Sequence, residues 1–372
     1  MTCIKNSIAG QVGVGLLGSR FISSIHVEAL RSVKDAEILA VASATEENVR
    51  SFAAKHKIAH WFTDYQKLLE MPEIDMVVIG LPNHLHCEAV LAAAAAGKDI
   101  VLEKPMAPSL AECNRMIAAC NKAGVKLMYA EELCFAPKYV RLKQLVDEGA
   151  IGVPYLLKQS EKHDGPHSEW FWDMERSGGG VTLDLGCHAF EFFRWLLSGP
   201  DCLNRPRAVS VLAQMGTYVH GDKTRGDDDA IIIVEFENGC RGLAEESWAK
   251  LGGMDDRAEV YGSKGLAYAN LLQGNSIQTY SQNGYEYAVE KSGGTKGWSF
   301  TIYEELWNYG FPQEMAHFVD CVKHDNQPIV TGEDGLAVME IVMAAYASAG
   351  EGRRIDLPLH VDAKRPIDLW LK

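Results

Sequence analysis

The sequence lacks several features that would direct it to a membrane, a nucleic acid or a secretory route. No run of about 18 apolar residues occurs, so we expect no segment that spans a bilayer. Lys and Arg number 36 against 50 Asp and Glu, and the net charge of −14 disfavours nucleic acid and anionic membranes as partners. The segment Met1 to Gln11 lacks the charged-then-apolar pattern of a signal peptide.

Paired cysteines are missing as well. The nine cysteines are scattered, and no two of them form a Cys-x-x-Cys pair. This excludes the cysteine spacing of common zinc sites and, together with the missing signal pattern, favours reduced thiols. We therefore expect a cytoplasmic protein.

The first third of the chain alternates short β-rich runs with helical runs. Apolar strands separated by helices predict a parallel sheet covered on both faces, which is a doubly wound α/β (Rossmann) domain. The strand-like runs are 12–17, 37–42, 76–81, 100–102 and 126–130, and the helical runs are 21–33, 46–56, 84–96 and 110–123.

The pattern changes after about Pro137, where strand-like runs follow one another without intervening helices. Asn238-Gly239 between two of these runs is a hairpin signal, and helical periodicity returns at 314–323 and 335–348. We predict a dinucleotide-binding domain over residues 1–136 and an α+β domain with a mainly antiparallel sheet over 137–372. The strand-like runs are 155–159, 208–216, 230–236, 241–248, 259–262, 266–269 and 277–280.

A glycine-rich turn follows the first strand. Gly13 to Gly18 match Gly-x-Gly-x-x-Gly literally, but Gly13 and Gly15 lie inside the apolar run, so we interpret them as strand residues. Arg20 would crowd the approach of a pyrophosphate to the backbone, although its guanidinium could bind a phosphate. A plain strand–turn–helix without a ligand remains the alternative. The predicted cofactor-binding turn is Gly18, Ser19, Arg20, Phe21, Ile22 and Ser23.

The end of the second strand normally distinguishes NAD from NADP. An acidic residue there binds the ribose 2′-hydroxyl of NAD, whereas Arg accommodates the 2′-phosphate of NADP. The tip here, 42–45, carries neither. Ser43 and Arg20 could hold a 2′-phosphate, and neutral residues also tolerate NAD, so both cofactors remain open.

Three residues are candidates for the chemistry. Lys104 follows the strand 100–102, where ligands of doubly wound sheets bind, and Pro105 restricts its backbone. Asp184 and His188 are four residues apart after three glycines, which predicts a shared helical face. Histidine can accept a hydroxyl proton, and an ammonium can stabilise the resulting alkoxide. The alternatives are a surface lysine, a helix-start aspartate and a core histidine.

Other polar and aromatic groups are weaker candidates. His163 and His167, near Asp164 and Glu169, resemble a metal cluster, but they lie in a loop-like stretch and we predict no metal. Trp170 and Trp172 could stack on a sugar ring or pack in a core. We expect 227–229, three consecutive aspartates, to form a solvated turn that enters a strand.

Taken together and in order, these segments resemble the glucose–fructose oxidoreductase/inositol dehydrogenase (Gfo/Idh/MocA) family across nearly the whole chain. The matching segments are the glycine turn with His26, Pro82-Asn83-His84-Leu85-His86, Ala96-Gly97-Lys98, Glu103-Lys104-Pro105, the triple glycine with Asp184 and His188, Glu314 to Phe318, and Thr331 to Gly335. The resemblance implies a Rossmann domain and an open-faced sheet whose face commonly forms the interface of a homo-oligomer, a dimer or tetramer.

The resemblance also implies roles for individual residues. Lys104 matches the active-site lysine, Asp184 the substrate-binding aspartate and His188 the catalytic histidine of the family. Family substrates are cyclic sugars, glycosides and inositols. The residues implied near the nicotinamide are Pro82, Asn83, His86, Glu103 and Lys104, and we add Glu132, His163 and Trp172 as candidate substrate ligands.

The chain departs from the family at two places. Arg20 and Ser23 stand where small residues are usual. Many members carry Asn or Gln and Arg after the sixth strand, whereas this chain has Glu131-Glu132-Leu133-Cys134. A carboxylate there could receive sugar hydroxyls, or could pair with Arg141 or Lys138.

The sequence thus predicts an NAD- or NADP-dependent oxidoreductase acting on a secondary hydroxyl of a small carbohydrate, glycoside or polyol. One alternative is a glycoside-cleaving enzyme that uses tightly bound NAD in a redox-cycling elimination. A second is a non-catalytic nucleotide-sensing regulator, which Lys104 and His188 argue against.

Overall fold

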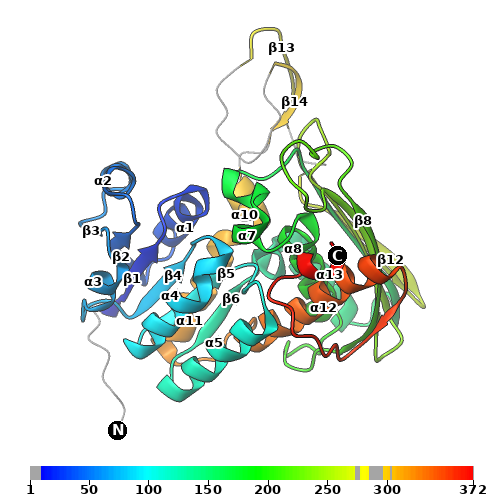
Figure 1. Cartoon of the computed structure of the whole chain (residues 1–372), viewed down its shortest axis with the longest axis horizontal. Helices are drawn as coiled ribbons and strands as arrows, with labels where there is room; N and C mark the ends of the chain where they lie inside the picture. Colours follow the sequence, from blue (N-terminus) through cyan, green and yellow to red (C-terminus); the bar gives the residue numbers. More distant parts are fainter. Residues whose placement is uncertain (1–9, 273–276, 285–295, 302–303, 372) are drawn as a thin grey trace. The chain divides into compact units, whose positions relative to one another are not determined.

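The computed structural model describes residues 10–272, 277–284, 296–301 and 304–371. They form two compact units, shown in Figure 1. The first comprises Met1–Glu132 and Phe311–Leu336, and the second Leu133–Gly310 and Ala337–Lys372. Residues 311–336, which the sequence placed in the second domain, thus belong to the first unit, because α11 (Phe311–His324) packs on α1 (Phe21–Arg31) and β1 (Val12–Leu17).

The first unit is built on a six-stranded sheet in the order β3-β2-β1-β4-β5-β6. Every neighbouring pair is parallel, so the predicted doubly wound Rossmann fold is confirmed. The remaining elements are β2 (Ala36–Ala42), α2 (Glu46–Lys55), β3 (His60–Phe62), α3 (Tyr65–Leu69), β4 (Met76–Ile79), η2 (Asn83–Leu85), α4 (His86–Ala95), β5 (Asp99–Glu103), α5 (Leu110–Ala123) and β6 (Leu127–Ala130).

Helices pair on this sheet, α1 with α11 and α4 with α5 (Figure 1). The central strands are buried along their whole length, as their continuous apolar runs predict. Two elements of this unit, β3 and α3, are not predicted from the sequence. Both are short, and β3 is largely exposed, so neither carries a strong hydrophobic period.

The glycines inside β1 are packing residues. A Cβ on Gly13 would lie 1.9 Å from the carbonyl oxygen of Glu73, and one on Gly15 would lie 2.6 Å from Cδ2 of Leu68. The backbone N–H of Gly13 donates to the Asp75 carboxylate at 3.0 Å. The literal Gly-x-Gly-x-x-Gly match is therefore a strand feature, as interpreted from the sequence.

The second unit contains a seven-stranded sheet in the order β12-β11-β7-β10-β9-β8-β15. It is mainly antiparallel, as predicted, with one parallel pair between β7 and β10. The strands are β7 (Pro154–Lys162), β8 (Ala208–Gly216), β9 (Asp229–Phe236), β10 (Arg241–Ser247), β11 (Asp255–Gly262), β12 (Gly265–Asn270) and β15 (Ile355–Asp356), and β13 (Ile277–Ser281) pairs with β14 (Gly297–Thr301).

One face of this sheet is covered and the other is open. Helices α8 and α9 contact its central strands, and burial alternates along β9 as a half-covered sheet requires. No helix in the described ranges is long and apolar enough to cross a membrane. The helices are η3 (Glu132–Phe135), α6 (Pro137–Asp147), η4 (Glu169–Trp172), α7 (Met174–Ser177), α8 (Val181–Asp184), α9 (Gly186–Leu196), α10 (Glu305–Tyr309), α12 (Gly332–Glu351) and α13 (Ile367–Trp370).

The hairpin predicted at Asn238-Gly239 joins β9 to β10. Gly239 has a φ of +81°, and the Asn238 side chain accepts the backbone N–H of Cys240 at 3.1 Å. Glycine supplies the left-handed backbone that this tight turn needs.

Candidate active site

The predicted phosphate-binding turn lies where the strand order of the first unit reverses, between β1 and β4. Gly18 follows β1 with a φ of +124°, and a Cβ there would lie 2.4 Å from the carbonyl oxygen of Gly80, which follows β4. Helix α1 begins three residues later at Phe21. A helix N-terminus at this switch point is where doubly wound sheets bind a pyrophosphate, so the described residues fit a dinucleotide.

Arg20 and Ser43 border this turn. Arg20 is exposed and is the N-cap residue of α1, but its side chain makes no capping hydrogen bond. The Ser19 hydroxyl donates to the Ser43 hydroxyl at 2.9 Å, which ties the turn to the tip of β2. The residues predicted to contact the cofactor phosphates thus lie on two connected loops.

The loop after β5 presents Lys104. The lysine is half-buried, and its backbone N–H donates to the Glu103 carboxylate at 3.1 Å. The other oxygen of Glu103 lies 2.7 Å from Nε2 of His26, and both side chains are buried. Because the His26–Glu103 pair is removed from water, it keeps the glutamate directed at the Lys104 backbone. The Lys104–Pro105 peptide bond is cis.

His86 supports the same loop. Its Nε2 lies 2.8 Å from the carbonyl oxygen of Leu81, and its Nδ1 lies 3.1 Å from that of Pro105. Burial lowers the pKa of His86. The ring therefore joins the tips of β4 and β5 through backbone contacts, which gives this predicted cofactor ligand a role in holding the Lys104 loop. Asn83, beside it in η2, is buried, and Pro82 precedes that helix.

Carboxyl groups gather behind this loop within the first unit. Glu131 and Glu314 have no exposed surface, and Glu132 is 8% exposed. Burial raises the pKa of Glu131 to about 8, with Lys104 opposing the rise and Glu103 adding to it. Burial, followed by the neighbouring glutamates, raises the pKa of Glu314 well above its usual range.

Asp184 and His188 both lie in the second unit, but not on one helix as predicted. Asp184 ends α8, and His188 lies in the first turn of α9. The Cys187 thiol donates to the Asp184 carbonyl at 3.1 Å, the acceptor that the His188 amide would use in an uninterrupted helix. The His188 N–H bonds to Leu185 instead. Both candidate side chains are nevertheless buried, at 7% and 2% exposure.

An indole orients the Asp184 carboxylate. Nε1 of Trp248, which follows β10, donates to Oδ2 of Asp184 at 3.1 Å, and Trp248 is fully buried. An indole N–H is a donor only, so this contact fixes one carboxylate oxygen as an acceptor. Trp248 is not among the predicted site residues; it closes the strand-like run 241–248, and a tryptophan at the end of a strand is a signal that could have found it.

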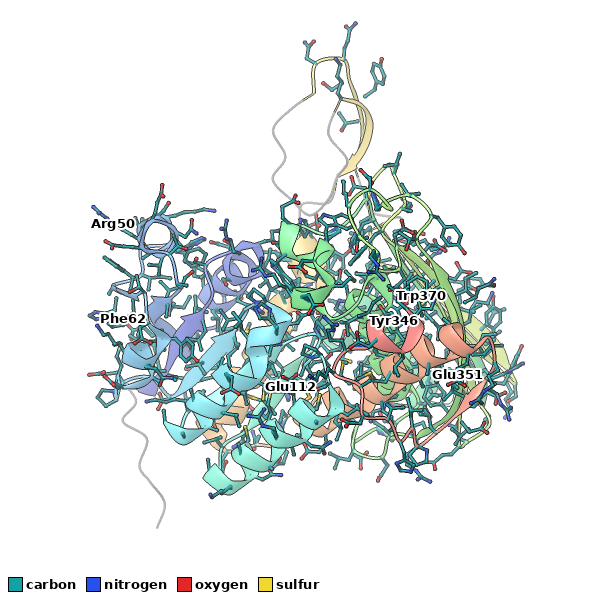
Figure 2. The ribbon with its side chains drawn as sticks, viewed as in Figure 1. Arg50, Phe62, Glu112, Tyr346, Glu351 and Trp370 are labelled. Carbon is teal, nitrogen blue, oxygen red and sulfur yellow. The ribbon has the colours of Figure 1, made fainter. Side chains whose placement is uncertain are left out.

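A buried aspartate holds the glycine turn before α8. The Asp227 carboxylate accepts the backbone N–H of Gly180 at 3.1 Å and that of Thr182 at 2.8 Å. The hydroxyl of Tyr346, labelled on α12 in Figure 2, donates to the same carboxylate at 2.5 Å. A Cβ on Gly180 would lie 2.1 Å from the Asp227 carbonyl oxygen, so this position has no room for a side chain.

The prediction of a solvated turn at 227–229 is therefore wrong for its first two residues, which have no exposed surface. The Asp228 carboxylate accepts three backbone N–H groups, each at 2.7 Å, from Tyr218, Val219 and His220. Consecutive aspartates normally indicate a segment exposed to solvent. Here backbone N–H groups donate the hydrogen bonds that water would otherwise supply to the buried carboxylates.

Aromatic side chains surround Trp172, which is half-buried in η4. Its ring packs edge-to-face on Trp248, with centroids 5.3 Å apart, and the Lys223 ammonium lies 5.2 Å from its centroid. Trp170 stacks on Phe171 at 3.9 Å. His163 is buried just after β7, where its Nδ1 accepts the N–H of Gly165.

Carboxyl groups also line the covered face of the sheet. Glu161 is the cross-strand neighbour of both Glu246 and Asp256, and all three are buried. The Tyr139 hydroxyl donates to Asp256 at 2.5 Å. Burial, followed by repulsion from Asp256, raises the pKa of Glu246 well above its usual range. We call these three residues the acid row.

The family follows from a comparison of both parts of the chain with known families. Residues 11–131 match the oxidoreductase family with an NAD-binding Rossmann fold, and residues 139–268 match the GFO/IDH/MocA C-terminal domain. The chain belongs to the GFO/IDH/MocA family. It is thus an oxidoreductase with an NAD-binding domain, and the resemblance drawn from the sequence is confirmed.

Relatives in this family match along nearly their full length. The chain is 29% identical to a myo-inositol 2-dehydrogenase of Thermotoga maritima over 92% of this chain and 98% of that one. It is 28% identical to an NAD(+)-dependent scyllo-inositol 2-dehydrogenase of Bacillus subtilis over 95% and 98%. Among solved structures, GenD2 from gentamicin A biosynthesis, in complex with NAD, has a TM-score of 0.86 at 28% identity, covering 94% of this chain and 97% of that one.

The predicted site residues of this GFO/IDH/MocA protein divide between its units. The predicted phosphate-binding turn that begins at Gly18 belongs to the first unit, as do Ser43, Lys104 and Glu132. The second unit contains His163, Trp172, Asp184 and His188. Arg141, one of the cations considered as partners for the carboxylates after β6, lies in α6. It pairs with Glu148, the residue that follows this helix.

Gly180→Ala should destabilise the protein by about 1–3 kcal/mol, because the added methyl overlaps the Asp227 carbonyl oxygen. Urea unfolding followed by tryptophan fluorescence measures the change. Gly221→Ala is the matched control, since its nearest contact would be 4.0 Å away, at Thr217. Equal loss in both variants would contradict the assigned packing role of Gly180.

Proposed function

We propose that this protein transfers a hydride reversibly between a secondary hydroxyl of a sugar, glycoside or polyol and a nicotinamide cofactor. The observation that carries the proposal is the Asp184 carboxylate, buried, fixed by the Trp248 indole and placed just before the α9 turn that bears His188. Relatives named as inositol dehydrogenases support a polyol as the substrate class.

The proposed residues divide the work of the oxidation direction among them. His188 accepts the hydroxyl proton as the C=O bond forms. The Lys104 ammonium donates a hydrogen bond to the same oxygen and stabilises its negative charge. Asp184 accepts a hydrogen bond from a neighbouring hydroxyl and orients His188. The bound nicotinamide supplies the acceptor for the hydride that leaves the carbon.

The wider substrate contacts follow from the chemistry of a hydroxyl-rich ring. The Trp172 indole offers an apolar surface on which the C–H face of a sugar can stack. His163 and Glu132 supply polar groups that can bond to ring hydroxyls. We propose these three residues as further substrate ligands.

A panel of sugars, glycosides and inositols, assayed for NADH or NADPH formation at about 340 nm, tests the function. We expect steady reduced-cofactor accumulation with at least one member, and about a 10²–10⁴-fold lower turnover for His188→Ala, because the proton acceptor is lost. His324→Ala, an exposed histidine at the end of α11, is the control. A folded His188→Ala protein that binds cofactor and turns over like its parent would falsify the role.

We propose that the tip of β2 decides between NAD and NADP. Ser43 is half-buried, and its hydroxyl accepts a hydrogen bond from Ser19 in the predicted phosphate-binding turn. Because serine is neutral, it would not repel the 2′-phosphate of NADP. Ser43→Asp should raise the kcat/KM ratio for NAD over NADP by about tenfold or more, since the carboxylate binds ribose hydroxyls and repels phosphate. Ala44→Asp, on the exposed neighbouring position, should change the ratio less. An unchanged ratio in the first variant would remove Ser43 from cofactor selection.

We propose further that a second copy of the chain covers the open face of the seven-stranded sheet. Leu212, Ile231 and Ile233 lie on neighbouring strands with 46%, 49% and 38% of their surface exposed. Exposed apolar patches of this kind mark protein interfaces. Ile231→Lys should lower the mass measured by light scattering to that of a single chain, whereas Leu251→Lys, in a loop, should not. A parent protein of single-chain mass contradicts the proposal.

A further inference from the structure

Strand register in the first unit brings Lys104 next to an acid. Strands β5 and β6 are parallel neighbours in which Glu103 lies opposite Ala130. The following residues, Lys104 and Glu131, therefore leave the sheet at adjacent tips. Glu131 has no exposed surface, so its carboxyl group meets protein groups rather than bulk water.

We propose that Glu131 is a positioning residue that sets the net charge presented by Lys104 to the substrate oxygen. This inference rests on the proposed function, because it assigns a control to the lysine of that site. When Glu131 is ionised, its negative charge offsets that of the ammonium. When Glu131 is protonated, the full positive charge of Lys104 is available to stabilise an alkoxide.

The charged groups of the first unit around Glu131 make this control selective. Glu103 is paired with His26, at 2.7 Å, and the charge of Lys104 favours the ionised form of Glu131. Glu314, from α11, faces Glu131 and is fully buried. Two buried carboxyl groups resist being ionised together, so at least one proton remains in this cluster over much of the pH range.

The proton of Glu131 is therefore exchanged within the range in which a dehydrogenase works. Burial raises the pKa of this carboxyl to about 8. Below that pH the group is neutral and Lys104 acts with its full charge, and above it the charge is offset. Turnover in alcohol oxidation should then fall on the alkaline side with an apparent pKa near 8, while the acid side reflects the proton acceptor.

Glu131→Gln tests this control, since the amide keeps the size of the side chain and cannot ionise. We expect the alkaline limb of the kcat profile to disappear in this variant, with cofactor binding retained. Glu131→Asp should restore a limb at a shifted pH. Glu132→Gln, next in sequence, should keep the limb whatever its effect on the rate. A limb that persists unchanged in Glu131→Gln would overturn the inference.

A second measurement needs no turnover and separates this inference from the proposed function. Reductive methylation with ¹³C-formaldehyde labels lysine amines, and the signal of Lys104 is identified by its absence in Lys104→Arg. In the parent this signal should show an inflection near pH 8 that is missing in Glu131→Gln. An inflection without oxidation of any panel member would leave the inference standing and count against the function. Absence of the inflection would overturn the inference regardless of activity.

Discussion

The Asp227 carboxylate, out of contact with solvent, provides the interaction on which the position of α8, and with it Asp184, depends. Its oxygens accept hydrogen bonds from the backbone N–H groups of Gly180 and Thr182 and from the Tyr346 hydroxyl in α12. These donors come from two segments that lie far apart in sequence. An unpaired carboxylate in this position would be costly, and satisfied as it is, it fixes where α8 starts. The direction of Asp184 follows from that start, and the Trp248 indole completes it.

The same principle governs the lysine loop of the first unit. The two glutamates near Lys104 have different surroundings: Glu103 is paired with His26, whereas the charge of Lys104 favours the ionised form of Glu131. The flexible side chain of Lys104 therefore starts from a fixed backbone position and lies in a defined electrostatic environment. Preorganisation of this kind is the main contribution that a protein can make to charge stabilisation during a reaction.

Much of the fold could be predicted from the sequence, because it depends on local periodicity. Apolar runs with helices between them predict the parallel sheet of the first unit, and Asn238-Gly239 alone predicts the β9–β10 hairpin of the second unit. Gly13 and Gly15 could be excluded from the phosphate turn because they lie within an apolar run, and the structure bears this out.

The parts that could not be predicted depend on partners distant in sequence. The burial of Asp227 is matched by a hydrogen bond from Tyr346, more than a hundred residues away. The return of α11 to the first unit depends on packing against α1, and neither helix indicates this alone. Local patterns thus identify the elements and several candidate residues, while the contacts that orient those residues arise only in the folded chain.

The buried carboxyl groups of the acid row affect how many protons the chain takes up when it folds. A carboxyl group such as that of Glu246 is ionised in an unfolded chain above pH 4.5, its ordinary pKa, yet burial and Asp256 favour its neutral form in the native state. For this group, folding near neutral pH takes up a proton from the buffer, and its own contribution to stability declines as the pH rises above 4.5. Calorimetric heats of unfolding would then include the ionisation heat of the buffer.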